Sequence, residues 1–160
     1  MSLREVPPFD VLSGGNHPYE GFGTILREHQ WASPLREVAA NAQRRVHDVF
    51  ERETALGRSG VAVLDSLIRE MWASAWSPER GSVNLFAMDF GCIFMLAIHR
   101  ECGGECLSRS STDLSHASVW WPASGVEAFP FHRVLRALQH DDGESLVFFF
   151  DRLKHTITPT

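Results

Sequence analysis

The sequence has no hydrophobic run long enough to cross a membrane and no apolar leader at its start. Its most apolar stretch, residues 85–98, is interrupted by Asp89 and Gly91 and falls short of the ~20 residues that a spanning helix needs. The opening residues, MSLREVPPFD, lack the apolar segment of a secretory signal. Three cysteines, an odd number, favour a reducing compartment. We therefore expect a cytoplasmic protein that has no membrane partner.

Clustered positive charge is also scarce. The net charge is −5, and Arg44-Arg45 is the one doublet of basic residues. Binding to phosphates needs clustered lysine and arginine, so we expect no nucleic-acid partner. An acidic balance is compatible with a soluble enzyme or with docking onto a basic protein partner. Glycine-rich nucleotide-binding patterns are absent, and we expect no cofactor.

What the sequence does contain is the material of one globular domain. Its 160 residues are 44% hydrophobic and 22% charged, which is ordinary globular usage. Residues 1–32 are rich in glycine and proline and predict an irregular N-terminal arm, either a loop packed over the core or a partner-binding segment. Residues 33–160 predict a single α+β domain.

Hydrophobic periodicity predicts three helices in the first part of this domain. Ser33 suits an N-cap and Pro34 the first helical position, so a helix is expected from there to just before Gly57. A second amphipathic helix is expected from Ser59 to the break at Ser77-Pro78. The third, over 83–102, is apolar nearly all round, which is typical of a buried central helix.

A short antiparallel sheet and two further helices are expected after residue 102. Gly103-Gly104 suits a helix end, a strand follows over 105–109, and residues 117–121 and 126–129 alternate as a β-hairpin does. Helices are then expected from Pro130 and over 144–155. Phe148 and Phe149 do not both fit the inward stripe of the last helix, so one should pack against the arm or a second copy. The order predicts an α+β fold: amphipathic N-terminal helices and a central buried helix packed on a short antiparallel sheet, with two C-terminal helices.

The stretch IHRECGGEC brings together residue types that bind zinc. His99, Cys102 and Cys106, with His116 as a fourth ligand, are candidates for a tetrahedral site. The spacing matches no zinc-finger pattern, and C-x-x-C is absent. The alternative is that these cysteines are small buried hydrophobic residues at the end of a helix, and we favour it.

The string GCIFMLAIHRECGG followed by HASVW resembles the helix-then-strand layout of transglutaminase-like and papain-like enzymes. That resemblance implies a cysteine-dependent acyl-transfer enzyme in which Cys92 is the nucleophile and His116 its base. The family places a carboxylate on the next strand, where Glu127 is the closest substitute. Cys92 also falls inside the apolar helix, where burial raises a thiol pKa.

A second resemblance covers residues 35–153 and rests on LDSLIREMW, DFG, GGE, VWW and EAFPFHRVLRAL. These segments look like those of small bacterial domains of unknown function. The resemblance implies the fold and a bacterial origin, and it transfers no activity. By analogy with small acidic domains of this kind, it suggests an accessory or toxin-immunity role.

We therefore expect a non-enzymatic bacterial protein-interaction domain, with the cysteine enzyme and the zinc-binding domain as alternatives. Aromatic side chains combined with charge suit an interface. The expected binding surface consists of Trp120, Trp121, Glu127, Asp141 and Asp142. The alternative for the tryptophans is that one lies in the core and the other covers a loop. A homodimer is expected through the hairpin or the last helix.

Overall fold

The computed structural model of the chain describes residues 10–11, 26–74, 80–108, 117–140 and 145–157. Over these residues it confirms the α+β fold, with all strand pairings antiparallel. The helices are α1 (Glu28–Phe50), α2 (Arg58–Ala73), α3 (Arg80–Cys102), α4 (Pro130–Gln139) and α5 (Leu146–Ile157). The strands are β1 (Asp10–Val11), β2 (Leu26–Arg27), β3 (Glu105–Ser108), β4 (Ser118–Trp121) and β5 (Val126–Ala128).

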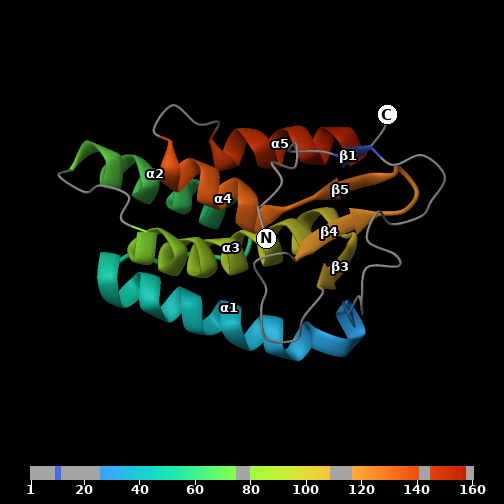
Figure 1. Cartoon of the computed structure of the whole chain (residues 1–160), viewed down its shortest axis with the longest axis horizontal. Helices are drawn as coiled ribbons and strands as arrows, with labels where there is room; N and C mark the ends of the chain where they lie inside the picture. The colour runs from blue at the N-terminus through green and yellow to red at the C-terminus, as the bar shows by residue number, and fades with distance from the viewer. Residues whose placement is uncertain (1–9, 12–25, 75–79, 109–116, 141–144, 158–160) are drawn as a thin grey trace.

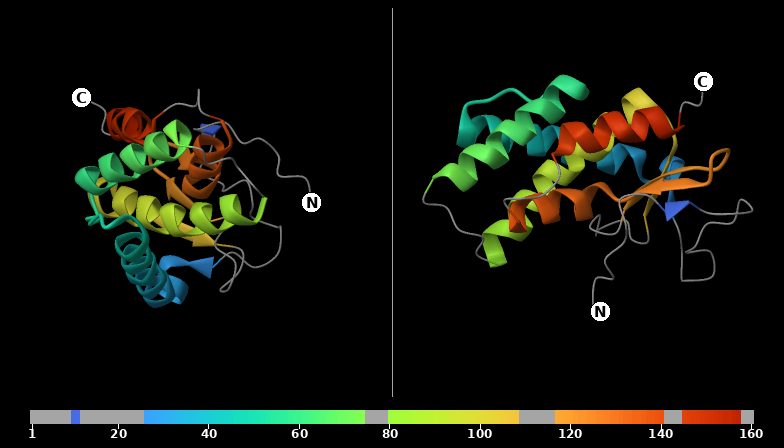
Figure 2. Two further views of the ribbon diagram at one scale, coloured as in Figure 1. Left: turned by 90° about the vertical axis from the view of Figure 1, so that its left-hand side faces the viewer. Right: turned by 90° about the horizontal axis from the view of Figure 1, so that it is seen from above.

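Helix α3 is the centre of the molecule, as its all-round apolar sequence predicts. It contacts every other helix, and Figure 1 shows it between α1 on one side and the α4–α5 layer on the other. All residues from Asp89 to Ile98 are buried. The two further views in Figure 2 show the sheet at one end of this helical stack. A helix without a polar face is stable here because a neighbouring element covers each of its sides.

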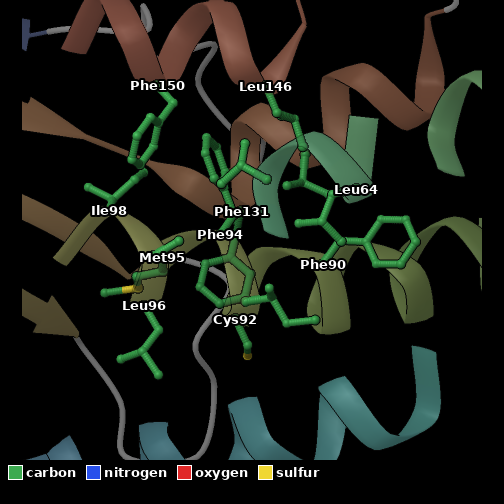
Figure 3. Close-up of a cluster of buried hydrophobic side chains, with 14 of the residues drawn as sticks. Leu64, Phe90, Cys92, Phe94, Met95, Leu96, Ile98, Phe131, Leu146 and Phe150 are labelled. Carbon is green, nitrogen blue, oxygen red and sulfur yellow. The ribbon is translucent and has the colours of Figure 1, made fainter. Parts of the chain in front are cut away.

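The contact between α3 and α4 depends on Gly91. A Cβ atom added at this position would lie inside van der Waals distance of the Phe131 ring. Glycine therefore lets the ring approach the α3 backbone, at a cost in helix propensity of about 1 kcal/mol relative to alanine. Figure 3 shows Phe131 from α4 and Phe150 from α5 converging on α3 beside Phe94 and Ile98.

The five strands of the described residues form one sheet in the order β1-β5-β4-β3-β2. The expected hairpin is present: Val119 pairs with Ala128 and Trp121 with Val126. Strand β3 pairs with the free side of β4 in this hairpin, with Cys106 opposite Val119. The glycines expected after α3 both have positive φ, +70° at Gly103 and +86° at Gly104, and they turn the chain from the helix into β3.

The predicted start of the first helix is wrong by six residues. Helix α1 begins at Glu28, so Ser33 is not its N-cap and Pro34 lies inside it. Proline there forgoes one hydrogen bond of the helical ladder. Pairing of β2 with β3 brings the chain to the helix before the proline is reached, and this tertiary contact overrides the local signal. The span 1–32, which we expected to be a largely irregular arm with a short strand near residues 24–26, contains strands β1 and β2 and the first residues of α1.

Among the described residues, no helix combines the length and apolar character required to cross a membrane. Helix α3, the most apolar of them, is instead covered by the other elements of this domain.

Candidate functional site

The pairing register divides the sheet into two faces of different chemistry. Side chains opposite one another in an antiparallel pair lie on the same face. One face carries Cys106, Val119, Trp121, Val126 and Ala128, all of which belong to the hydrophobic core. The other face carries Glu105, Leu107, Ser118, Trp120 and Glu127, none of which belongs to that core cluster. Alternation along the hairpin thus separates the two adjacent tryptophans.

Both tryptophans of the expected binding surface are buried. Trp121 is 8% exposed, packs in the core and donates a hydrogen bond from Nε1 to the Cys102 carbonyl at 2.9 Å. Trp120, on the opposite face, is 4% exposed. The expectation that they form an exposed aromatic patch is therefore wrong. The reason is that the sheet is covered on both faces, which an alternating sequence pattern does not reveal.

Glu127 does not belong to an exposed surface either. It lies opposite Trp120 in the register and has 0% of its surface exposed. The expected surface role of Glu127 therefore disagrees with its burial. Its other suggested role, as the carboxylate of the acyl-transfer alternative, stays a prediction, because that carboxylate would orient His116, which lies outside the described residues.

The Cys92 thiol is enclosed in the middle of α3. It is 0% exposed, and Figure 3 shows its sulfur pointing toward α1. Burial raises its pKa from the ordinary 9.0 to about 12; the nearby Asp89 carboxylate adds to the shift, and Arg45 opposes it. A nucleophilic cysteine needs the opposite, a thiolate stabilised at a helix N-terminus and open to substrate. The local geometry of Cys92 is that of a core residue.

Asp89, one turn before Cys92, forms a bidentate ion pair with α1. The Arg45 guanidinium donates from Nε and Nη2 to the two carboxylate oxygens, at 2.9 and 2.6 Å. The carboxylate is nearly buried, with 10% of its side chain exposed, whereas the arginine side chain is 51% exposed. Arg45 thus provides a counter-charge for the Asp89 carboxylate, which lies in the buried part of α3. The hydrogen bond to Asp89 raises the pKa of Arg45.

The three described zinc candidates, His99, Cys102 and Cys106, do not come together as a metal site, and the fourth, His116, lies outside the described residues. Within the described part of the chain, no three His, Cys, Asp or Glu side chains form a group that could hold a metal ion. Cys106 is buried in the core on β3, and Cys102 is partly buried at the end of α3. Burial raises the pKa of Cys102 to about 11. Both positions agree with the interpretation of these cysteines as packing residues.

Three further candidate residues, His116, Asp141 and Asp142, lie outside the described residues. For the proposed dyad of Cys92 with His116, the structure therefore describes only the buried thiol of Cys92. The same holds for the acidic part of the expected binding surface.

Helix α5 is held firmly at its N-terminus by a side chain of another helix. The buried Asp65 carboxylate on α2 accepts hydrogen bonds from the backbone N–H groups of Leu146 and Val147, at 2.7 and 2.8 Å. Ser145 accepts the next N–H, that of Phe148, through its Oγ atom at 3.0 Å. These are the groups that a helix start leaves without intrahelical partners. The first turn of α5 is thus anchored, and the direction of its side chains with it.

This anchored turn presents the most exposed aromatic side chain of the described residues. Phe148 is 55% exposed, while the adjacent Phe149 is 1% exposed and packs edge-on against Phe94 at 5.9 Å between ring centroids. The sequence predicts that only one of this pair faces inward, and Phe149 is that one. Val49 near the end of α1 is the one other large hydrophobic residue with high exposure in the described part of the chain.

Arginines contact both rings of the pair. The Arg152 guanidinium lies over the Phe148 ring at 5.7 Å from its centroid, and the buried Arg133 of α4 lies over the Phe149 ring at 4.7 Å. Both distances are in the range of cation–π interactions. Sequence reasoning missed both arginines. The Arg133–Phe149 pair joins two different helices, α4 and α5, and the Arg152–Phe148 pair lies on the exposed face of α5. The i, i+4 spacing of Phe148 and Arg152 was the one available signal.

Comparison of the chain with protein-family models, curated proteins and solved structures finds no match in any of the three.

Proposed function

We propose that this chain is a non-enzymatic protein-interaction domain that acts in the bacterial cytoplasm in an accessory or immunity-like role. The observation that supports an interaction role is Phe148: an aromatic side chain, 55% exposed, on a helix turn held by Asp65. Rigid aromatic side chains with a neighbouring arginine are the usual anchors of protein interfaces. The bacterial and immunity-like parts of the proposal rest on the sequence resemblance described above.

The environment of Cys92 argues against the cysteine-enzyme alternative. Its thiol is closed off in the core, and its raised pKa leaves little thiolate at neutral pH. The exposed aromatic side chain of Phe148 is instead an apolar ring without catalytic chemistry. A binding function uses that ring directly, because excluding water from it on contact is favourable.

A site-specific photo-cross-linker tests the proposal. Benzoylphenylalanine placed at Phe148 in the native host should give one discrete covalent adduct to a protein partner. The same residue at Val49 of α1, which is 64% exposed, serves as the matched control and should give about tenfold less adduct. Equal yields at both positions, or no adduct at position 148, would refute the interaction role of this surface.

A further inference from the structure

Phe148, the exposed ring of the proposed interface, lies in the first turn of α5, which begins at Leu146. The first turn is where a helix frays, because its N–H groups have no partners inside the helix. A ring on a fraying turn would have to be ordered each time a partner binds, and this ordering weakens binding. The affinity of the proposed interface therefore depends on what holds this turn in place.

Two side chains hold the turn, and they do different things. Ser145 accepts the N–H of Phe148 at 3.0 Å, but it belongs to the same segment and moves with α5. Asp65 of α2 accepts the N–H groups of Leu146 and Val147, one on each carboxylate oxygen, so it fixes the turn relative to another helix. Hydrogen bonds to a charged acceptor are about twice as strong as neutral ones. Asp65 is only 9% exposed, so it lies beneath the surface that presents Phe148.

Helix α2 is itself held at its start, which makes it a firm support for Asp65. Its N-cap, Gly57, has no side chain that could accept a hydrogen bond. Glu101 near the end of α3 accepts the N–H of Arg58 instead, at 3.0 Å. A carboxylate of α3 thus caps α2, and a carboxylate of α2 caps α5. The turn that carries Phe148 is connected in this way to the central helix of the fold.

A second contact joins α5 to α2 on the other side of Phe148. The Arg58 guanidinium donates to both carboxylate oxygens of Asp151, each at 3.0 Å, and this lowers the pKa of Asp151. The two side chains are 55% and 47% exposed. An ion pair so open to water contributes little, whereas the hydrogen bonds of Asp65 are largely shielded from it. We therefore expect Asp65 to be the stronger of the two attachments.

We propose that Asp65 is a positioning residue of the partner-binding surface. It keeps the turn that carries Phe148 ordered, so loss of this carboxylate weakens partner binding although the partner binds above it. The inference rests on the proposed interaction function and adds α2 to the residues that control it. The buried apolar side chains of α5 do not replace Asp65, because apolar contacts have no preferred direction, whereas hydrogen bonds to N–H groups do.

Amide hydrogen exchange of the full chain, followed by NMR, tests the ordering without any partner. Asp65→Ala removes both acceptors and should speed exchange of the Leu146 and Val147 amides about a hundredfold relative to amides in the middle of α3. Asp65→Asn keeps one oxygen and should speed it about tenfold. Gly91→Ala is the matched control, because it destabilises the contact of α3 with α4 and should not single out these two amides. If Asp65→Ala does not fold, Asp65→Asn decides; unchanged relative exchange in the folded variant overturns the inference.

The cross-linking experiment then connects the ordering to binding. Benzoylphenylalanine at position 148 should give about tenfold less adduct when combined with Asp65→Asn, and nearly the full yield when combined with Gly91→Ala. An adduct that is equally strong in Asp65→Asn overturns the positioning role and leaves the interaction function intact. Equal losses in both variants would reflect general destabilisation and would also overturn it. Absence of any adduct in the otherwise unchanged protein refutes the interaction function itself, and this inference with it.

Discussion

The two sides of α3 are packed by different physical means. Toward α4, the contact depends on shape: Gly91 leaves room for the Phe131 ring against the helix backbone. Toward α1, it includes charge and a thiol: Asp89 is paired with Arg45, and the Cys92 sulfur is enclosed nearby. The four residues Asp89–Cys92 serve both sides within one turn of helix. One apolar helix therefore makes two different interfaces, and substitutions in them should destabilise the protein for different physical reasons.

The largest expected effect concerns the Cys92 thiol on the α1 side. Its pKa rises from 9.0 to about 12, which makes the thiolate about a thousandfold scarcer at neutral pH, and the side chain is fully buried. Iodoacetamide should therefore modify Cys92 in the folded protein at least about a thousandfold more slowly than in urea. Cys102, which is partly buried, should react sooner than Cys92.

Mass spectrometry of the labelled peptides measures both rates, and a Cys102→Ala variant isolates the signal of Cys92. Rapid modification of Cys92 in the folded protein, faster as the pH rises through 7, would contradict its place in the core and revive the cysteine-enzyme alternative.

The next effect concerns the α4 side. Gly91→Ala adds one methyl group where the Phe131 ring already lies, and overpacking of this kind costs about 1 to 3 kcal/mol. The better helix propensity of alanine offsets up to about 1 kcal/mol of that cost. We expect a net loss of about 2 kcal/mol in the free energy of unfolding, measured by urea denaturation.

A second substitution identifies the cause of this loss. Phe131→Leu in the Gly91→Ala background should cost less than the sum of the two single changes, because the smaller side chain makes room for the methyl group. Strict additivity of the two changes would show that the ring contact does not limit the approach of α3 and α4.

An effect of equal or smaller size concerns the Arg45–Asp89 pair, and it should be asymmetric. Arg45→Met leaves a nearly buried carboxylate without its cation and should cost about 2 kcal/mol. Asp89→Asn leaves an arginine that is half exposed and can reach water, and should cost about 1 kcal/mol. Urea denaturation of both variants gives the two values. The reverse order would show that burial of Asp89 does not control the pair.

Much of the fold could be predicted because its signals are local. Helix α3 was recognised from residues 83–102 by an apolar sequence without a polar face, and the hairpin by alternation around a turn. The start of α1 could not be predicted, since the pairing of β2 with β3 overrides the capping signal of Ser33 and Pro34. Local propensity is a weak preference that tertiary contacts of this kind outweigh.

The candidate sites were harder to predict because they depend on what covers a residue. Trp120 and Trp121 read as exposed aromatic residues, yet the sheet buries both of its faces. Phe148 was identified only as one member of an ambiguous pair, and its exposure follows from the anchoring of α5 by Asp65, which lies 81 residues away from Leu146 in sequence. A helix cap supplied by a residue so far away in sequence cannot be predicted from a local sequence pattern.

Over residues 33–160, the sequence by itself determined the kinds of secondary structure, their order and the central place of α3, since periodicity and turn residues act within a few positions along the chain. Only the tertiary structure decided which side of α3 meets α1 and which meets α4, that both tryptophans are covered, and that Phe148 rather than Phe149 is exposed. Those outcomes depend on contacts between residues that are far apart in sequence, and the free energy of such contacts exists only once the chain has folded.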